Sequence, residues 1–164
     1  MIEVLKYPHQ ILLEKSTPWH SGDKIDGHED IEKFEKEMAH EMIKQNGIGL
    51  AANQIGITKR FFCIGSDTFD TFKKPVIIWN PQIIKSSEEK VIDVEGCLSF
   101  PGIWVKVERP KIVEVMYETT QGKTRFAKLN GFESKCYQHE YDHIEGITFN
   151  QRVSKLRWDM AKKG

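Results

Sequence analysis

The residues most capable of chemistry form one short string, His139-Glu140-Tyr141-Asp142-His143. The pattern around it predicts a helix, on which residues four apart lie one above the other with about 5–6 Å between their Cβ atoms. Both imidazoles can therefore reach one metal ion, and the glutamate after the first histidine lies near enough to act as a general base on water. The string predicts a metal-dependent hydrolase. The alternative is an exposed helix face that carries two histidines and some carboxylates.

The helical wheel favours the metal site over the exposed face. One narrow arc of the predicted helix holds an aromatic residue, a thiol and both histidines: Phe132, Cys136, His139 and His143. We expect this arc to point into the protein and Asp142 to point elsewhere. Buried histidines need partners, and one metal ion would satisfy both of them.

A catalytic zinc-type site needs a third protein ligand as well as an open position. Downstream of His143 the chain has no further histidine, and its only carboxylates are Glu145 and Asp159. Glu145 is too close along the helix to turn back to the same metal ion, and Asp159 is a weak candidate. The downstream options for a third ligand are therefore nearly exhausted.

The three cysteines of the chain differ in their surroundings. Cys136 lies about 10 Å from His143 along the helix axis, so we expect it to pack beside the site without sharing the ion. Cys63 lies in an apolar run that is typical of a core strand. Cys97 lies in a Gly/Pro-flanked loop (residues 95–102), where a thiolate could be presented next to exposed backbone amides.

A run of small residues, GIGLAANQIG (residues 47–56), also needs an explanation. A helix and not a strand precedes it, so it is no dinucleotide-binding fingerprint, and no Gly-Lys-Ser/Thr follows, so it is no P-loop. One interpretation is a helix end followed by a buried segment. The other is a backbone that a ligand can approach closely because side chains are missing, with Gln54 as an amide donor.

Helical and strand patterns elsewhere supply the frame for these residues. Apolar residues at spacings of three and four predict an amphipathic helix over residues 30–45, after a surface connection at 16–30. The elements predicted after that helix are strands at 60–65, 76–80, 103–108, 111–118 and 124–130 and helices at 132–144 and 153–163. This order predicts an α+β fold in which mostly antiparallel strands surround a central metal-binding HExxH helix, with an amphipathic N-terminal helix and a short C-terminal one.

The composition limits the class of protein. The chain has 164 residues, 24 of them basic and 24 acidic, so its zero net charge gives no electrostatic support for a dedicated nucleic-acid binder. An apolar fraction of 39% and a charged fraction of 29% exclude disordered and membrane classes. Three cysteines suit a reducing compartment. No signal peptide or spanning segment is visible, so we expect one cytoplasmic domain (residues 1–164) that binds neither DNA nor membrane.

Three motifs, in this order and spacing, closely resemble the signature motifs of the peptide deformylase family: GIGLAANQIG (47–56), EGCLS (95–99) and QHEYDH (138–143). The similarity extends over nearly the whole chain. The family removes the formyl group from the N-formylmethionine of new polypeptides and releases formate. The resemblance therefore implies a hydrolase of protein biosynthesis that acts on N-formylmethionyl nascent chains. It also implies one divalent metal ion, usually Fe²⁺, for which Zn²⁺, Ni²⁺ or Co²⁺ can substitute.

The resemblance implies roles for individual residues. The matching metal ligands are Cys97, His139 and His143, with water as the fourth ligand. Glu140 matches the catalytic acid/base of the family. Gln54 and the Leu98 backbone amide match the groups that bind the oxyanion, which fixed donors stabilise in the transition state.

The same resemblance implies where the substrate lies. The Gly49 backbone is expected to lie against it, and the pocket for the methionine side chain is expected near four residues: Ile48, Gly96, Phe132 and Cys136. The peptide is expected to lie extended against a strand edge, so that residues beyond the first matter little. Glu95 and Arg109 look like the family's supporting ion pair beneath the metal loop. An ordinary surface pair is the alternative.

Three residues depart from the family pattern. Trp104 stands where many members carry an arginine near the substrate backbone. Leu13 replaces a common arginine in the N-terminal segment, and Lys135 occupies a usually apolar position beside the pocket. These departures bear on substrate contacts, N-terminal packing and pocket shape, and none of them touches the metal ligands or the base.

The tail from Gln151 onward is short and basic. It carries Asp159 as its only acidic residue and five basic ones: Arg152, Lys155, Arg157, Lys162 and Lys163. A contact with the ribosome is one hypothesis for this tail, and a solvated basic helix is the alternative.

Two other functions are compatible with parts of the sequence. An HExxH-type metallo-endopeptidase would take its third ligand after His143, so Cys97 would not bind the metal ion. A catalytically inactive module that binds metal or the ribosome would not need Glu140 and Gln54, both of which are present.

Overall fold

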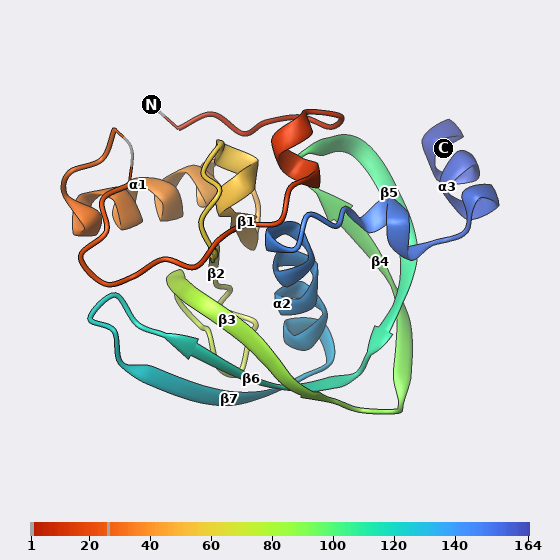
Figure 1. Ribbon diagram of the computed structural model, residues 1–164. Helices are drawn as coiled ribbons and strands as arrows, with labels where there is room; N and C mark the ends of the chain where they lie inside the picture. The colour runs from red at the N-terminus through yellow and green to blue at the C-terminus, as the bar shows by residue number, and fades with distance from the viewer. Residues whose placement is uncertain (1, 26) are drawn as a thin grey trace.

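The amphipathic pattern near the N-terminus forms α1 (Ile31–Lys44) in the computed structural model, which describes residues 2–25 and 27–164 (Figure 1). Asp30 caps the helix, because its carboxylate accepts a hydrogen bond from the Lys33 amide at 3.1 Å. The apolar face of α1 contributes three buried side chains to the core: Phe34, Met38 and Met42. The predicted first helix is therefore confirmed.

The main sheet has five antiparallel strands in the order β1-β2-β3-β6-β7. Their bounds are β1 (Gly49–Ala51), β2 (Phe61–Ile64), β3 (Val76–Ser86), β6 (Ile112–Glu118) and β7 (Thr124–Asn130). The strands predicted in these regions are present, and β7 has the predicted bounds. β1 lies outside the predicted strands, because three residues are too few to show an alternating pattern.

β3 is longer than its predicted range of 76–80. It continues past Pro81, and the register between β3 and β6 shifts between Trp79 and Gln82. Asn80 has a φ of 45° at this irregularity. A bulge of this kind accommodates a proline that cannot donate a ladder hydrogen bond.

A separate hairpin is formed by β4 (Lys90–Cys97) and β5 (Phe100–Pro110). β4 lies outside the predicted strands, because most of its side chains are exposed and show no alternation of buried apolar residues. Cys97, expected in a loop, is the last residue of β4. The loop that follows is reduced to Leu98 and Ser99.

The helix α2 (Gly131–Ile144) lies at the centre of the molecule, with the main sheet on one side and the β4–β5 hairpin on another (Figure 1). Surrounding elements bury almost every residue from Glu133 to Ile144. The expected single inward arc is therefore wrong at two positions. Phe132 is 47% exposed, and Asp142 is buried. A helix enclosed on several sides has no solvent face to which a carboxylate can turn.

Residues 16–30 are packed more closely than a surface connection. Trp19 and Ile25 are buried, and the Trp19 ring stacks on Trp79 with centroids 4.0 Å apart. The expectation of a loose connection is wrong for these two residues. Asp26, which belongs to the same predicted connection, lies outside the described residues.

The chain ends in α3 (Lys155–Lys163), which begins two residues later than predicted and is capped by the Ser154 hydroxyl. Trp158 of α3 packs edge-on against Phe149 and Phe100, which joins the helix to β5. None of the helices in the described part of the chain combines the length and the apolar character needed to cross a lipid bilayer.

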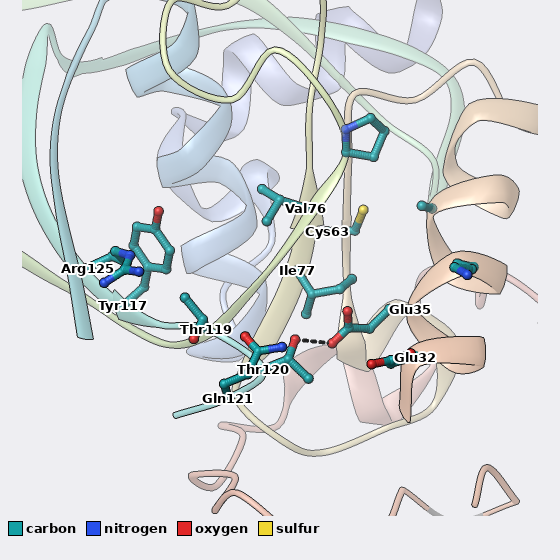
Figure 2. A pocket seen from close by; sticks show the side chains of 13 residues that line it. Glu32, Glu35, Cys63, Val76, Ile77, Tyr117, Thr119, Thr120, Gln121 and Arg125 are labelled. Carbon is teal, nitrogen blue, oxygen red and sulfur yellow. Dashed lines mark hydrogen bonds between the residues drawn. The ribbon is translucent and has the colours of Figure 1, made fainter. Parts of the chain in front are cut away.

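A hollow of about 510 Å³ lies between α1 and the turn that joins β6 to β7 (Figure 2). Glu35 of α1 meets Thr120 of the turn, with Glu32 beside it, and Cys63 of β2 also lines the hollow. Glu35 accepts a hydrogen bond from the Thr120 hydroxyl. We call this region the side hollow.

Candidate active site and metal centre

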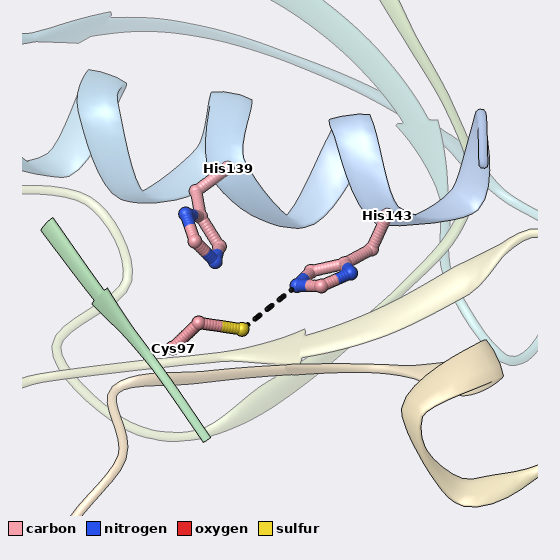
Figure 3. A group of neighbouring side chains, drawn as sticks. All are labelled: Cys97, His139 and His143. Carbon is pink, nitrogen blue, oxygen red and sulfur yellow. Dashed lines mark hydrogen bonds between the residues drawn. The ribbon is translucent and has the colours of Figure 1, made fainter. Parts of the chain in front are cut away.

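Three metal-ligating side chains from two distant elements meet beside α2 (Figure 3). Cys97, at the end of β4, faces His139 and His143, which lie one turn apart on α2. The ligating atoms of the three residues lie within 4.8 Å of one another. Cys97 Sγ is 3.3 Å from His143 Nε2, although 46 residues separate them in the chain. The structure therefore brings the three predicted ligands together.

The three side chains fit a divalent metal ion in type as well as in position. One thiolate and two imidazoles are donors that suit zinc and iron-group ions. Burial lowers the pKa of His143 well below its usual value, so the imidazole is neutral and can offer a ring nitrogen as a ligand. Within residues 2–25 and 27–164, no other trio of His, Cys, Asp or Glu side chains gathers in this way.

A buried carboxylate fixes the orientation of His139. Glu95 Oε1 lies 2.9 Å from His139 Nδ1, which turns the other ring nitrogen toward Cys97 (Figure 3). Arg109 donates two hydrogen bonds to the same carboxylate, at 2.6 and 3.0 Å. Burial opposes the ionisation of Glu95, but the hydrogen bonds from His139 and Arg109 outweigh it and lower its pKa to about 2. The Glu95–Arg109 pair is an interior pair and not a surface one.

Asp142 and Arg152 extend this network beyond the predicted residues. Asp142 accepts a hydrogen bond from Arg109 at 2.8 Å and two from Arg152, at 2.7 and 2.9 Å. A buried carboxylate needs such cationic partners. The enclosure of α2, which creates that need, has no signal in the sequence. Arg152 therefore belongs to the network around the site and is set apart from the exposed basic residues of α3.

Glu140 is buried, and its Oε1 has no hydrogen-bond partner among the described residues. Burial raises the pKa of Glu140 to about 7, and the nearby His139 only partly opposes this. Gly49 of β1 provides the space for the side chain, since a Cβ atom on Gly49 would overlap the Glu140 carboxylate. The predicted close approach at this glycine is therefore made by the protein's own carboxylate.

Hydrogen bonds at both ends of its amide fix Gln54. Its Oε1 accepts from the Ala51 amide at 2.9 Å, and its Nε2 donates to Ser99 Oγ at 3.1 Å. The same Nε2 lies 3.6 Å from Cys97 Sγ. The donor end of Gln54 thus faces the turn that contains Leu98, next to the three metal-ligating residues.

A pocket of about 570 Å³ opens beside Cys97 and His139, and we call it the central pocket. It is lined by the four residues predicted to contact the methionine side chain: Ile48, Gly96, Phe132 and Cys136. The other predicted residues that line it are Gly49, Gln54, Leu98 and Glu140. The sequence motifs thus converge on one cavity.

Two of the departures from the family pattern also line the central pocket. Trp104 is 66% exposed, and its ring lies so close to Gly96 that a Cβ atom there would overlap it. Lys135 is almost fully buried. Leu13, the third departure, is exposed and lies outside the pocket lining.

The rejected ligand candidates lie elsewhere. Cys63 is buried in β2, and Cys136 packs beside the pocket, as expected. Glu145 pairs with Arg60 at 3.3 Å. Asp159 forms ion pairs within α3.

The α+β fold and this site define a class of protein, a metal-dependent hydrolase in which a cysteine from a separate strand joins the two histidines of an HExxH helix. The polypeptide deformylase family model matches residues 1–158, and the chain belongs to this family. It is an enzyme that removes the N-formyl group from nascent peptides.

Individual relatives agree with the family match. The peptide deformylase of Rhizobium meliloti is 37% identical over 154 residues, which cover 94% of this chain and 86% of the relative. The crystal structure of the Thermotoga maritima enzyme has a TM-score of 0.83 at 34% identity and covers 94% of this chain and 98% of that one. The Plasmodium falciparum enzyme has a TM-score of 0.86 at 32% identity, with coverage of 98% and 91%. The resemblance in the three motifs is confirmed, and the endopeptidase alternative is not favoured.

Proposed function

We propose that this deformylase binds one divalent metal ion through Cys97, His139 and His143 and uses Glu140 as its acid and base. The observation that carries the proposal is the free oxygen of Glu140, a buried carboxylate oxygen without a hydrogen-bond partner in the described residues. Glu140 lines the same pocket as Cys97 and His139. A buried polar atom is almost always satisfied, so an exception beside a set of metal-ligating residues points to a role in the reaction.

The test is formate release from a formyl-methionyl peptide under anaerobic conditions, combined with metal analysis of the same sample. The proposal expects about one metal ion per chain and loss of formate release when a chelator removes it. Full activity in a sample from which the metal has been removed would contradict the ligand assignment.

Glu140 moves the proton of the reaction. When bound, the metal ion supplies Lewis acidity, which lowers the pKa of water toward about 7. Glu140 Oε1 takes the proton of the attacking water and passes it to the leaving amine. A carboxyl with a pKa of about 7 can both accept and release a proton at neutral pH.

Gln54 Nε2 and the Leu98 backbone amide stabilise the negative charge that develops on the formyl oxygen. Gln54 suits this task because the Ala51 amide already holds its other end in place. A donor that is oriented before the reaction needs no reorganisation during it, and the loss of one such donor raises the barrier by about 3–4 kcal/mol.

The central pocket accepts the methionine side chain of the substrate. Its wall near Ile48, Phe132 and Cys136 is apolar, which suits a thioether side chain. The Gly49 and Gly96 backbones flank the peptide itself, which lies extended along a strand edge. The substrates are N-formylmethionyl nascent chains, and residues 1–164 act on them in the cytoplasm as one catalytic domain.

The metal ion in the cell is Fe²⁺, and Zn²⁺, Ni²⁺ or Co²⁺ can take its place. The Cys/His/His donor set suits all four ions. The support for iron is therefore the family resemblance and not the geometry. Metal analysis of protein purified without exposure to oxygen tests the assignment, and zinc as the dominant metal in such a sample would contradict it.

The basic tail contacts the ribosome. With Arg152 bound to Asp142, the basic residues that remain are Lys155, Arg157, Lys162 and Lys163. Truncation of the whole tail would also disturb Asp142, so the better test is replacement of Arg157 and Lys163 by glutamate. The measurement is the fraction of each protein that sediments with ribosomes, which should be lower for the variant than for the wild type. Equal fractions would mean that the tail is only a solvated helix.

A further inference from the structure

One edge of β4 pairs with β5 and the other is not paired with a strand among the described residues. At Val94, two side chains that form an ion pair occupy the backbone groups of this free edge. Val94 donates its amide to Asp93 Oδ1 at 2.8 Å, and its carbonyl accepts a hydrogen bond from Lys135 Nζ at 2.9 Å. Lys135 Nζ also pairs with Asp93 Oδ2 at 3.2 Å. Side chains and not a neighbouring strand therefore occupy both backbone groups of Val94.

The next position along this edge is Gly96. Residues two apart in a strand present their backbone groups to the same edge, so Gly96 faces the same side as Val94. Both residues line the central pocket. Because β4 runs toward Cys97, an antiparallel peptide with its formyl end at the metal-ligating residues meets Gly96 first and Val94 afterwards.

We infer that Asp93 and Lys135 end the peptide-binding edge of β4 after Gly96, and so limit the length of substrate that the enzyme recognises. The inference rests on the proposed function. A bound peptide can pair with Gly96, but its later residues find the hydrogen-bonding groups of Val94 already used. Nascent chains of any sequence then bind through their first residues alone.

The surroundings of the two side chains fit this role. The Lys135 side chain is only 6% exposed, and its ammonium group also lies 4.7 Å from the centre of the Phe132 ring. Such a group is held in one position and does not leave Val94 readily. The Asp93 side chain is 57% exposed, so its replacement removes the hydrogen bond without a loss of core packing.

The experiment compares KM for a formylated tripeptide, formyl-Met-Ala-Ala, with KM for the corresponding hexapeptide. In the wild-type protein the two values should agree within about twofold. Asp93→Ala frees the Val94 amide and Lys135→Met frees its carbonyl. In each variant the hexapeptide should have the lower KM by about three- to tenfold, the effect of one or two added main-chain hydrogen bonds.

Two matched variants serve as controls. Asp93→Asn removes the charge but keeps an oxygen that accepts from the Val94 amide, so it should behave like the wild type. Lys111→Met removes an ion pair with Glu89 (3.7 Å) outside the central pocket and should also leave the KM ratio unchanged.

A KM ratio that changes in Asp93→Ala and is restored in Asp93→Asn supports the inference, and this pair is sufficient even where Lys135→Met does not fold. The same ratio in every variant overturns it, as does a wild-type protein that already prefers the hexapeptide strongly. Absence of formate release from either peptide in the metal-loaded wild-type protein overturns the proposed function instead, and the inference with it.

Discussion

The central pocket and the side hollow are similar in size, about 570 and 510 Å³, and in several residue types. Each is lined by a glutamate whose pKa is raised by burial, Glu140 in one and Glu35 in the other. Cysteines line both: Cys97 and Cys136 the central pocket, and Cys63 the side hollow. They differ in whether these groups are already satisfied by the protein.

In the side hollow the reactive groups have partners or are inert. Glu35 accepts a hydrogen bond from Thr120, which accepts one from Trp79 Nε1 at 3.2 Å. Burial raises the pKa of Cys63 to about 12, so it stays a thiol. In the central pocket one Glu140 oxygen lacks a partner, and Cys97 lies near two imidazoles. A cavity with a perturbed carboxyl is therefore weak evidence for a site, and unsatisfied groups that converge are strong evidence.

The sharpest test of this comparison replaces the glutamate of each cavity by glutamine. Glu140→Gln should lower kcat by about 10²–10⁴-fold, because it removes the group that transfers the proton. Its metal content should stay at the wild-type level. Glu35→Gln, the matched change in the side hollow, should leave kcat unchanged. Formate release and metal analysis check both variants, and equal losses in the two would show that the comparison is wrong.

The amide donors of the two cavities form a second matched pair. Gln54→Leu should lower kcat by about 10²–10³-fold, because one donor to the developing negative charge is lost. Gln121→Leu changes the same residue type in the side hollow and should have no effect on kcat. A Gln54→Leu variant that raises KM alone would mean that Gln54 binds substrate without stabilising the transition state.

A smaller effect is expected for the carboxylate that orients His139. Glu95→Gln should weaken metal binding by about 10–100-fold, because partners that orient a ligating histidine usually contribute this much. Glu89→Gln changes a glutamate in an exposed ion pair with Lys111, just before β4, and should bind metal as the wild type does. Competition with a metal-binding dye measures both affinities. A metal affinity in Glu95→Gln equal to that of the wild type would show that Glu95 does not support metal binding.

The smallest effect concerns the stability of the side hollow. Burial raises the pKa of Glu35 above the usual range of a glutamate, so its ionised form is disfavoured in the folded protein. The resulting cost is absent below about pH 4 and complete above the folded pKa. Glu35→Gln should thus have a higher free energy of unfolding than the wild type at pH 7, and the same free energy of unfolding at pH 4. Urea unfolding of both proteins at pH 4 and pH 7 measures the difference in stability. A variant that gains more stability at pH 4 than at pH 7 would contradict the prediction.

Much of the fold was predictable because several elements carry their own local signal. The i, i+3, i+4 spacing of apolar residues marks α1, and the turn with Gly122 marks the hairpin of β6 and β7. β4 has no such signal, because its pairing with β5 leaves most of its side chains in solvent. Its strand conformation depends on the register with β5 and not on its own sequence.

The meeting of the three candidate metal ligands beside Glu140 was predictable from motifs, whereas their supporting contacts were not. Asp142 stands in the most conspicuous string of the chain, yet its partners Arg109 and Arg152 are known only once the helix is enclosed. The Asp93–Lys135 pair spans 42 residues and follows no spacing rule. Contacts of this kind are properties of the packed chain, so no local pattern indicates them.

The division of the proposed metal ligands between β4 and α2 has a consequence for how the enzyme acquires its ion. A chain in which only α2 has formed offers two imidazoles, and the sulfur arrives when the hairpin docks. An ion that needs all three side chains would bind the docked state and not the undocked one, so its binding would stabilise the contact between the hairpin and α2. Ion uptake would then report that the β4–β5 hairpin has docked on α2.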